Sequence, residues 1–186
     1  MQGNFDHDLA ARLAAAFPTN ETVPPEYRPN PTPYEKLYLQ DGAVREWPGP
    51  CTEVSSPICL HDNGKLQRPV LGHVPSMDED AAMAGLKAAV RAWDNGRGEW
   101  PTMSVAGRIA AVEKFTEKMV AVRDEVVRLL MWEIGKSLDD SRKEFDRTVD
   151  YIRLTVEALK EMDRNNSRFS IDSGVIAQVR RSPLGV

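Results

Sequence analysis

Residues 126–136, VVRLLMWEIGK, decide how this sequence folds. Apolar side chains occupy almost every side of the helix that this stretch predicts, which is opened by Asp124 and ended by Gly135. A helix that is apolar all round is buried on several sides. The stretch therefore predicts a helix packed deep within a folded domain.

Further helices are predicted on both sides of this stretch. A capping box at Ser76–Glu79 opens a helix to about Trp93, and Ser104 caps the next one. A long helix is predicted from about Leu138 to Met162. Its apolar stripe is spaced 4-3-4-3 and consists of Phe145, Val149, Ile152, Val156 and Leu159.

Strands are predicted upstream of these helices. Asp41-Gly42 is a type I′ hairpin signal between strands at 34–40 and 43–47. Two more strands, at 53–59 and 69–74, flank a turn at 61–64 and complete a simple antiparallel meander. Alternating apolar residues also predict a strand from Val175 to Arg181.

The pattern divides the chain into three parts. Residues 1–35 are predicted to form an N-terminal helix, Asp6–Phe17, followed by a proline-rich arm. Residues 36–75 form the β segment, and residues 76–186 form the helical part with the terminal strand. The predicted fold is thus mostly helical, with a short antiparallel β segment.

Composition excludes several classes of function. The chain has 186 residues, is 41% hydrophobic and carries a net charge of −4, which argues against a nucleic-acid-binding protein. No run of 18 apolar residues predicts a membrane span, and the N-terminus lacks a signal-peptide pattern, so we expect a cytoplasmic protein. Two cysteines fit a reducing compartment.

The residues alone offer few catalytic groups. Cys51 and Cys59 lack a histidine at a telling spacing and are interpreted as structural. Together with the scattered histidines they form no metal-binding pattern, so no metal site is predicted. Asp139 and Asp140 fit the first turn of the long helix, where the helix dipole stabilises negative charge. The glycines form no phosphate-binding loop.

Arg147 is the one residue that the sequence singles out. At about 100° per residue it lies about 200° round the long helix from Phe145, and so faces away from the apolar stripe. Tyr151 and Leu154 lie on or near the same face. The side chain either binds an anion or pairs at the surface with Asp150 or Glu144.

Five segments resemble the bacterial NADP-dependent non-phosphorylating glyceraldehyde-3-phosphate dehydrogenases, which belong to the aldehyde dehydrogenase superfamily. They are 100–106 (WPTMSVA), 108–110 (RIA), 126–136, 144–151 (EFDRTVDY) and 178–186 (QVRRSPLGV). The strands at 36–74 also resemble the N-terminal β segment of that family. The resemblance covers roughly residues 36–186.

This resemblance implies an α/β, aldehyde dehydrogenase-like fold and a reaction. Family members oxidise an aldehyde to the acid: a cysteine thiolate attacks the aldehyde, hydride passes to NADP or NAD, and a glutamate activates water. The asparagine, lysine, glutamate and cysteine that do this would lie beyond Val186, where the first strand of the cofactor domain opens. No catalytic or cofactor-binding residue is therefore assigned here, and the chain alone is expected to be inactive.

One binding residue is carried over by the resemblance. In members with phosphate substrates, an arginine on the helix that matches residues 144–151 helps to hold the phosphate, and Arg147 fits that position. The implied partners are a small aldehyde substrate and further copies of the chain, as a homo-dimer or homo-tetramer, without nucleic acid or membrane. The alternative is a non-catalytic helical interaction module or a pseudoenzyme remnant of the same family.

Overall fold

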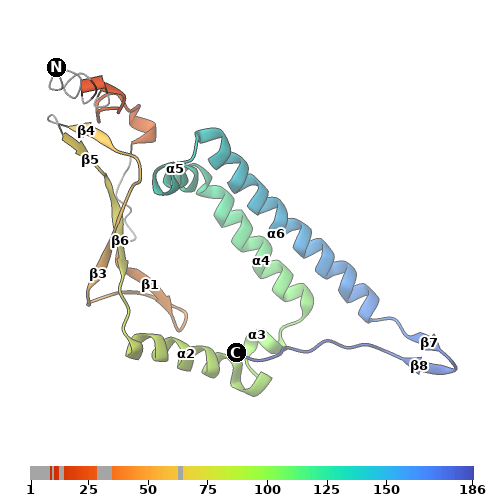
Figure 1. Ribbon diagram of the computed structural model, residues 1–186. Coiled ribbons are helices and arrows are strands. Elements are labelled where there is room, and N and C mark those ends of the chain that lie inside the picture. Colours follow the sequence, from red (N-terminus) through yellow and green to blue (C-terminus); the bar gives the residue numbers. More distant parts are fainter. Residues whose placement is uncertain (1–8, 10, 13–14, 29–34, 63–64) are drawn as a thin grey trace. The chain divides into compact units, whose positions relative to one another are not determined.

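The computed structural model describes the chain except residues 1–8, 10, 13–14, 29–34 and 63–64 (Figure 1). The chain divides into two compact units. The first comprises residues 1–39, 44–76 and 124–143. The second comprises residues 40–43, 77–123 and 144–186. Half of the predicted helix Asp6–Phe17, and residues 29–34 of the proline-rich arm, lie outside the described residues.

The first hairpin forms as predicted. Strands β1 (Leu37–Gln40) and β2 (Ala43–Glu46) pair as a two-stranded sheet. Asp41 and Gly42 have φ of 55° and 74°, the two positive values that a type I′ turn requires. The Asp-Gly signal was therefore sufficient to place this turn.

The next strands differ from the predicted meander. Residues 51–75 hold two nested antiparallel pairs in place of the two predicted strands at 53–59 and 69–74. The outer pair is β3 (Cys51–Ser55) with β6 (Val70–Pro75), and the inner pair is β4 (Leu60–Asp62) with β5 (Lys65–Gln67).

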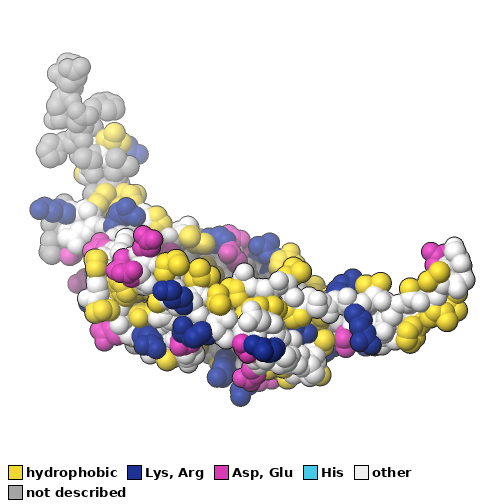
Figure 2. Space-filling model, turned by 90° about the horizontal axis from the view of Figure 1, so that it is seen from below, with side chains coloured by type: hydrophobic (Ala, Val, Ile, Leu, Met, Phe, Trp, Pro, Cys, Tyr) yellow, Lys and Arg dark blue, Asp and Glu magenta, His cyan; other side chains and the backbone are white. Residues whose placement is uncertain are grey.

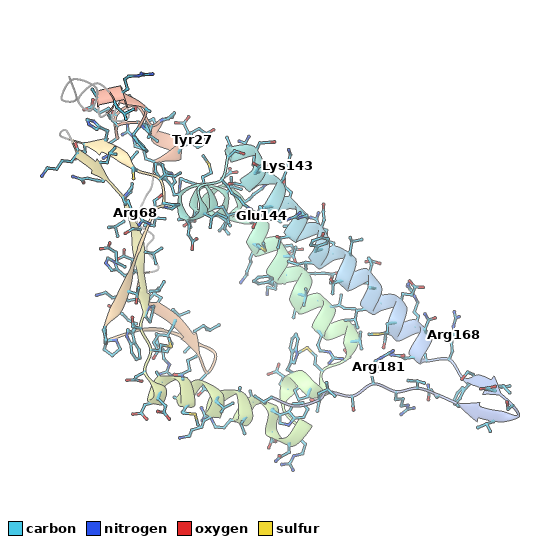
Figure 3. All side chains as sticks on the ribbon, in the orientation of Figure 1. Tyr27, Arg68, Lys143, Glu144, Arg168 and Arg181 are labelled. Carbon is cyan, nitrogen blue, oxygen red and sulfur yellow. The ribbon has the colours of Figure 1, made fainter. Side chains whose placement is uncertain are left out.

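The pairing of β3 with β6 ends at Ser55. The register between β3 and β6 shifts at Val54/Ser55. Arg68 bonds to the backbone where β3 ends (Figure 3). Its Nε donates to the carbonyl of Ser56 at 2.6 Å, and its Nη2 donates to the carbonyl of Ser55 at 3.4 Å. The prediction of one strand over 53–59 was wrong because these contacts are not local in sequence.

Helix α5 (Arg123–Ile134) supplies the centre of the first unit, as its apolar sequence predicted. Trp132 is 5% exposed and packs with Val23, Leu60 and Leu71. Gly135 ends the helix with φ of 68°. Trp132 is thus packed against both the strands and the N-terminal chain, which includes the short helix η1 (Pro25–Tyr27). Val127 is the other buried residue of α5, whereas Ile134 is 50% exposed, so the helix is buried on fewer sides than its sequence predicted.

Helix α2 (Glu79–Trp93) opens the second unit, with a different cap from the predicted one. The Asp78 side chain accepts from Ala81 N at 2.9 Å, whereas the Ser76 hydroxyl lies 2.7 Å from that of Thr52. Asp78 therefore takes the N-cap position that the capping-box pattern gave to Ser76. The helix ends in η2 (Asp94–Gly96) and is followed by α3 (Glu99–Thr102).

Two long helices dominate the second unit and run side by side, α4 (Val105–Ala121) and α6 (Leu138–Asn166) (Figure 1). Ser104 caps α4 by accepting from Gly107 N at 3.1 Å, as predicted. The predicted stripe of α6 is buried at Phe145, Val149 and Val156. The 3.6-residue periodicity therefore identified the packed face of α6 correctly.

The C-terminal region forms a short hairpin of β7 (Ser170–Asp172) and β8 (Val175–Ala177). The predicted strand Val175–Arg181 was too long, because β8 ends with its partner β7, and residues 178–186 have no regular structure. Figure 2 shows hydrophobic side chains along this hairpin at the right of the view. Those at least 60% exposed are Phe169, Ile171, Val175, Ile176 and Val179.

None of the described helices combines the length and the apolar character that a membrane span requires.

Candidate functional site on helix α6

Arg147 lies on the solvent side of α6. Phe145, two residues earlier, is 2% exposed, whereas the Arg147 side chain is exposed. Two residues rotate the helix by about 200°, so one faces the α4 side and the other faces outward. The sequence placed this side chain correctly with respect to the packed stripe.

The face around Arg147 is partly apolar. Tyr151 is 61% exposed and Leu154 is 64% exposed, one and two turns further along α6. An arginine beside large exposed apolar groups is suited to binding a molecule that has an anionic end and a carbon body.

Arg147 has no hydrogen-bond or ion-pair partner among the described residues. Asp150, one predicted partner, lies instead 3.5 Å from Arg153 Nη1. The guanidinium of Arg147 therefore keeps its donors available for an anion.

A groove of about 550 Å³ runs along α6 beside this face. It is lined by Thr148 and Tyr151 of α6, by Arg108 of α4 and by Trp100 of α3. Trp100 is 52% exposed there. No local sequence signal identifies this groove, because its walls are about 40 residues apart in the chain.

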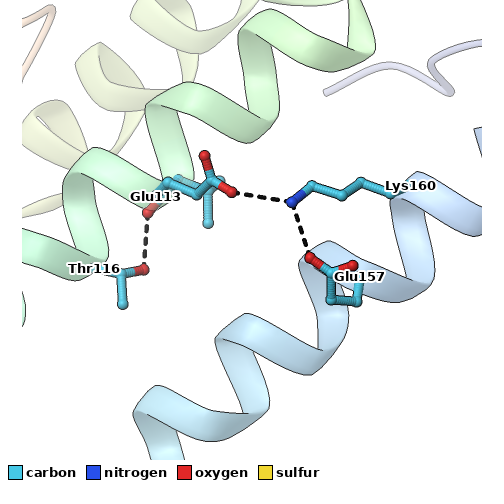
Figure 4. A network of polar contacts seen from close by, with 5 residues as sticks. Glu113, Thr116, Glu157 and Lys160 are labelled. Atoms are coloured by element: carbon cyan, nitrogen blue, oxygen red, sulfur yellow. Dashed lines mark hydrogen bonds and ion pairs between the residues drawn. The ribbon is translucent and has the colours of Figure 1, made fainter.

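On another side, α4 and α6 are joined by Lys160 (Figure 4). Lys160 Nζ lies 3.2 Å from Glu113 Oε1 and 2.9 Å from Glu157 Oε1. The hydrogen bond to Glu157, and then that to Glu113, raises the pKa of Lys160. The hydrogen bond to Lys160 lowers the pKa of Glu157. The contact with Glu113 bridges α4 and α6, whereas Glu157 and Lys160 both lie on α6.

The model of the aldehyde dehydrogenase family matches residues 62–186, which is more than half of the chain. The chain belongs to the aldehyde dehydrogenase family. It is 26% identical to malonate-semialdehyde dehydrogenase 2 of Shouchella clausii over 116 residues. This alignment covers 62% of this chain and 23% of that protein. It is 27% identical over 118 residues to N-succinylglutamate 5-semialdehyde dehydrogenase of Ectopseudomonas mendocina, covering 63% and 24%.

An aldehyde dehydrogenase of known structure shares the fold. The NAD-dependent aldehyde dehydrogenase from Sinorhizobium meliloti superposes with a TM-score of 0.59 at 22% identity, over 76% of this chain and 26% of that one. The α/β, aldehyde dehydrogenase-like fold predicted from the sequence is thereby confirmed. This chain spans about a quarter of the length of the aldehyde dehydrogenases that it matches.

The cysteines and aspartates that the sequence analysis considered have the following surroundings in this aldehyde dehydrogenase chain. Cys51 and Cys59 are free and half-buried, and Cys51 Sγ lies 3.8 Å from the carbonyl of Gly49. Asp139 lies 2.5 Å from Lys143 Nζ, and Asp140 accepts a hydrogen bond from Ser137 at the start of α6. The hydrogen bond with Asp139 raises the pKa of Lys143.

No three His, Cys, Asp or Glu side chains gather into a metal-binding group in the part of the chain that the structure describes. Arg147, the residue on α6 for which the sequence predicted substrate binding, lies exposed on the outer face of that helix.

Proposed function

We propose that this chain is the N-terminal part of an aldehyde dehydrogenase that oxidises a small anionic aldehyde to the corresponding acid. The observation that carries the proposal is the exposed guanidinium of Arg147, which has no protein partner in the described part of the chain. Its role is to bind the anionic group of the substrate through paired N–H donors. The cysteine nucleophile and the glutamate base belong to residues outside this chain.

Glyceraldehyde 3-phosphate is the substrate that we propose first. Its phosphate suits a planar guanidinium, which can donate two parallel hydrogen bonds. The relatives are named for malonate semialdehyde and N-succinylglutamate semialdehyde, which carry carboxylates in place of phosphate. An anionic group remote from the aldehyde is common to all three molecules and is what Arg147 would recognise.

The proposed oxidant is NADP, or NAD, which accepts the hydride. The sequence contains no glycine-rich phosphate loop. We therefore assign cofactor binding mainly to residues outside the chain. We further propose that the whole protein works in the cytoplasm as a homo-dimer or homo-tetramer.

The test is a steady-state assay of the whole polypeptide that carries this chain. Glyceraldehyde 3-phosphate, malonate semialdehyde and the uncharged propanal would each be offered with NADP⁺ and with NAD⁺. For the preferred anionic aldehyde, Arg147→Ala should lower kcat/KM by about tenfold or more, equivalent to about 1.4 kcal/mol of lost binding. The loss should appear mainly in KM, because the contact is present before the chemical step.

Arg153→Ala is the matched control, since Arg153 lies on the same helix, is exposed and pairs with Asp150. Arg153→Ala should leave kcat/KM unchanged for all three aldehydes. Arg147→Ala should leave kcat/KM unchanged for propanal, which has no anionic group. An equal loss on propanal would show that Arg147 supports the fold and does not recognise the anion. Absence of any oxidation would favour the helical interaction module or pseudoenzyme.

A further inference from the structure

The segment Pro18–Arg28 is bound to the first unit by specific contacts. The carbonyl of its first residue accepts a hydrogen bond from His61 N at 2.8 Å. The carbonyl of Tyr27 accepts another from Trp132 Nε1 at 2.6 Å. Between them, Val23 is 9% exposed and packs in the core. The segment is thus a fixed part of this unit, although it precedes the residues that match the family.

A pocket lies where this segment meets α5 and the start of α6. Its volume is about 350 Å³, within the range of small-molecule sites. Val127, Met131 and Leu138 give it an apolar wall, and Tyr27 closes it on the side of η1 (Figure 3). The N-terminal segment therefore completes a pocket that the helices alone would leave open.

Two arginines line the pocket, Arg128 of α5 and Arg142 of α6, together with two carboxylates. Arg128 is half-buried and Arg142 is exposed, and neither side chain has an ion pair among the described residues. Of the two carboxylates in the lining, Asp124 already interacts with another residue, and Glu26 is exposed. A guanidinium partly removed from water is stabilised by a carboxylate or phosphate, which can accept two hydrogen bonds from it.

We propose that this pocket binds a small organic anion, with its carboxylate or phosphate between Arg128 and Arg142 and its carbon body against the apolar wall. The segment Pro18–Arg28 forms one side of the site. Binding of the anion and docking of this segment therefore stabilise each other. Arg147 is not among the lining residues, and the inference does not depend on the proposed reaction.

The ligand is tested by titrating the full chain and following the indole N–H signals in ¹H–¹⁵N spectra. The Trp132 signal, assigned with Trp132→Phe, reports on the site because this N–H is bonded to Tyr27. Succinate, glycerol 3-phosphate and inorganic phosphate are the anionic probes, and glycerol is the neutral one. A saturable shift with succinate alone identifies a carboxylate site, and one with glycerol 3-phosphate alone identifies a phosphate-ester site.

The residues are tested with Arg128→Ala/Arg142→Ala, which should weaken binding at least about tenfold. The conservative Arg128→Lys/Arg142→Lys keeps the charge and should retain part of the affinity, which guards against misfolding of the alanine variant. Arg153→Ala should bind as the wild type does. Val23→Asp, which undocks the segment, should weaken binding as well.

Three outcomes overturn the proposal. The first is no saturable shift with any anion at millimolar concentration. The second is equal affinity in wild type and the double alanine variant. The third is an equal loss in Arg153→Ala, which would mean unspecific attraction of anions to a basic surface.

Discussion

The buried hydroxyl of Ser56 links the strands of the first unit to α5. Ser56 Oγ donates to the carbonyl of Trp132 at 2.5 Å and accepts from Ile58 N at 3.0 Å, and the residue is fully buried. Ser56→Ala would leave both backbone groups without these bonds. We expect it to reduce the free energy of unfolding by about 1–3 kcal/mol, measured by urea denaturation of the chain.

Ser167→Ala provides the matched control. The Ser167 hydroxyl also bonds to a carbonyl, that of Asp163, but it is exposed at the end of α6. Water replaces that bond, so the change should stay within about 0.5 kcal/mol. Equal effects of the two substitutions would contradict the role of Ser56. Nothing in the sequence distinguishes these serines, because the partner of Ser56 is 76 residues away.

At the scale of elements, local signals predicted the helices and missed part of the sheet. Three of the predicted features depend only on residues close together in the chain: the Ser104 cap, the Asp41-Gly42 turn and the apolar stripe of α6. The structure confirms each of them. The break between β3 and β4 depends on Arg68 and Ser56, whose partners come from elsewhere in the chain. For the candidate site, the helical period placed Arg147 on the exposed face but gave no sign of the neighbouring groove.

The contact between α4 and α6 should depend on pH through Lys160. A raised lysine pKa contributes stability that is complete below the unfolded-state pKa and is lost as pH rises through the folded-state pKa. The lowered pKa of Glu157 contributes stability that is lost as pH falls through its folded-state value. The contribution should therefore be greatest between about pH 5 and pH 10.

The measurement is the urea midpoint of the chain from pH 3 to pH 11. Lys160→Gln should lower the midpoint most inside that window and little at either extreme. The effect should be smaller than that of Ser56→Ala, since these charges are exposed to solvent. Lys114→Gln, on the exposed side of α4, is the control. A midpoint difference that is the same at every pH would rule out the ion pairs as its cause.

At the scale of the whole molecule, several large hydrophobic side chains of the described residues are exposed. The β7–β8 hairpin is the clearest case, because Ile171 and Ile176 are 74% and 69% exposed and lie opposite each other across the ladder. Large exposed apolar patches mark interaction surfaces. We therefore expect the chain to self-associate through this hairpin, in keeping with the proposed homo-oligomer.

Ile171→Lys/Ile176→Glu tests this surface while keeping the hairpin, because opposite charges facing each other across a ladder attract. In sedimentation velocity at several concentrations, we expect the wild-type mass to rise with concentration and that of the variant to stay monomeric. Phe115→Lys removes a 60% exposed apolar side chain from α4 and should still associate. If Phe115→Lys reduces association as much as the hairpin variant does, nonspecific hydrophobic association explains the assembly. If the hairpin variant still associates, the contact lies on another face.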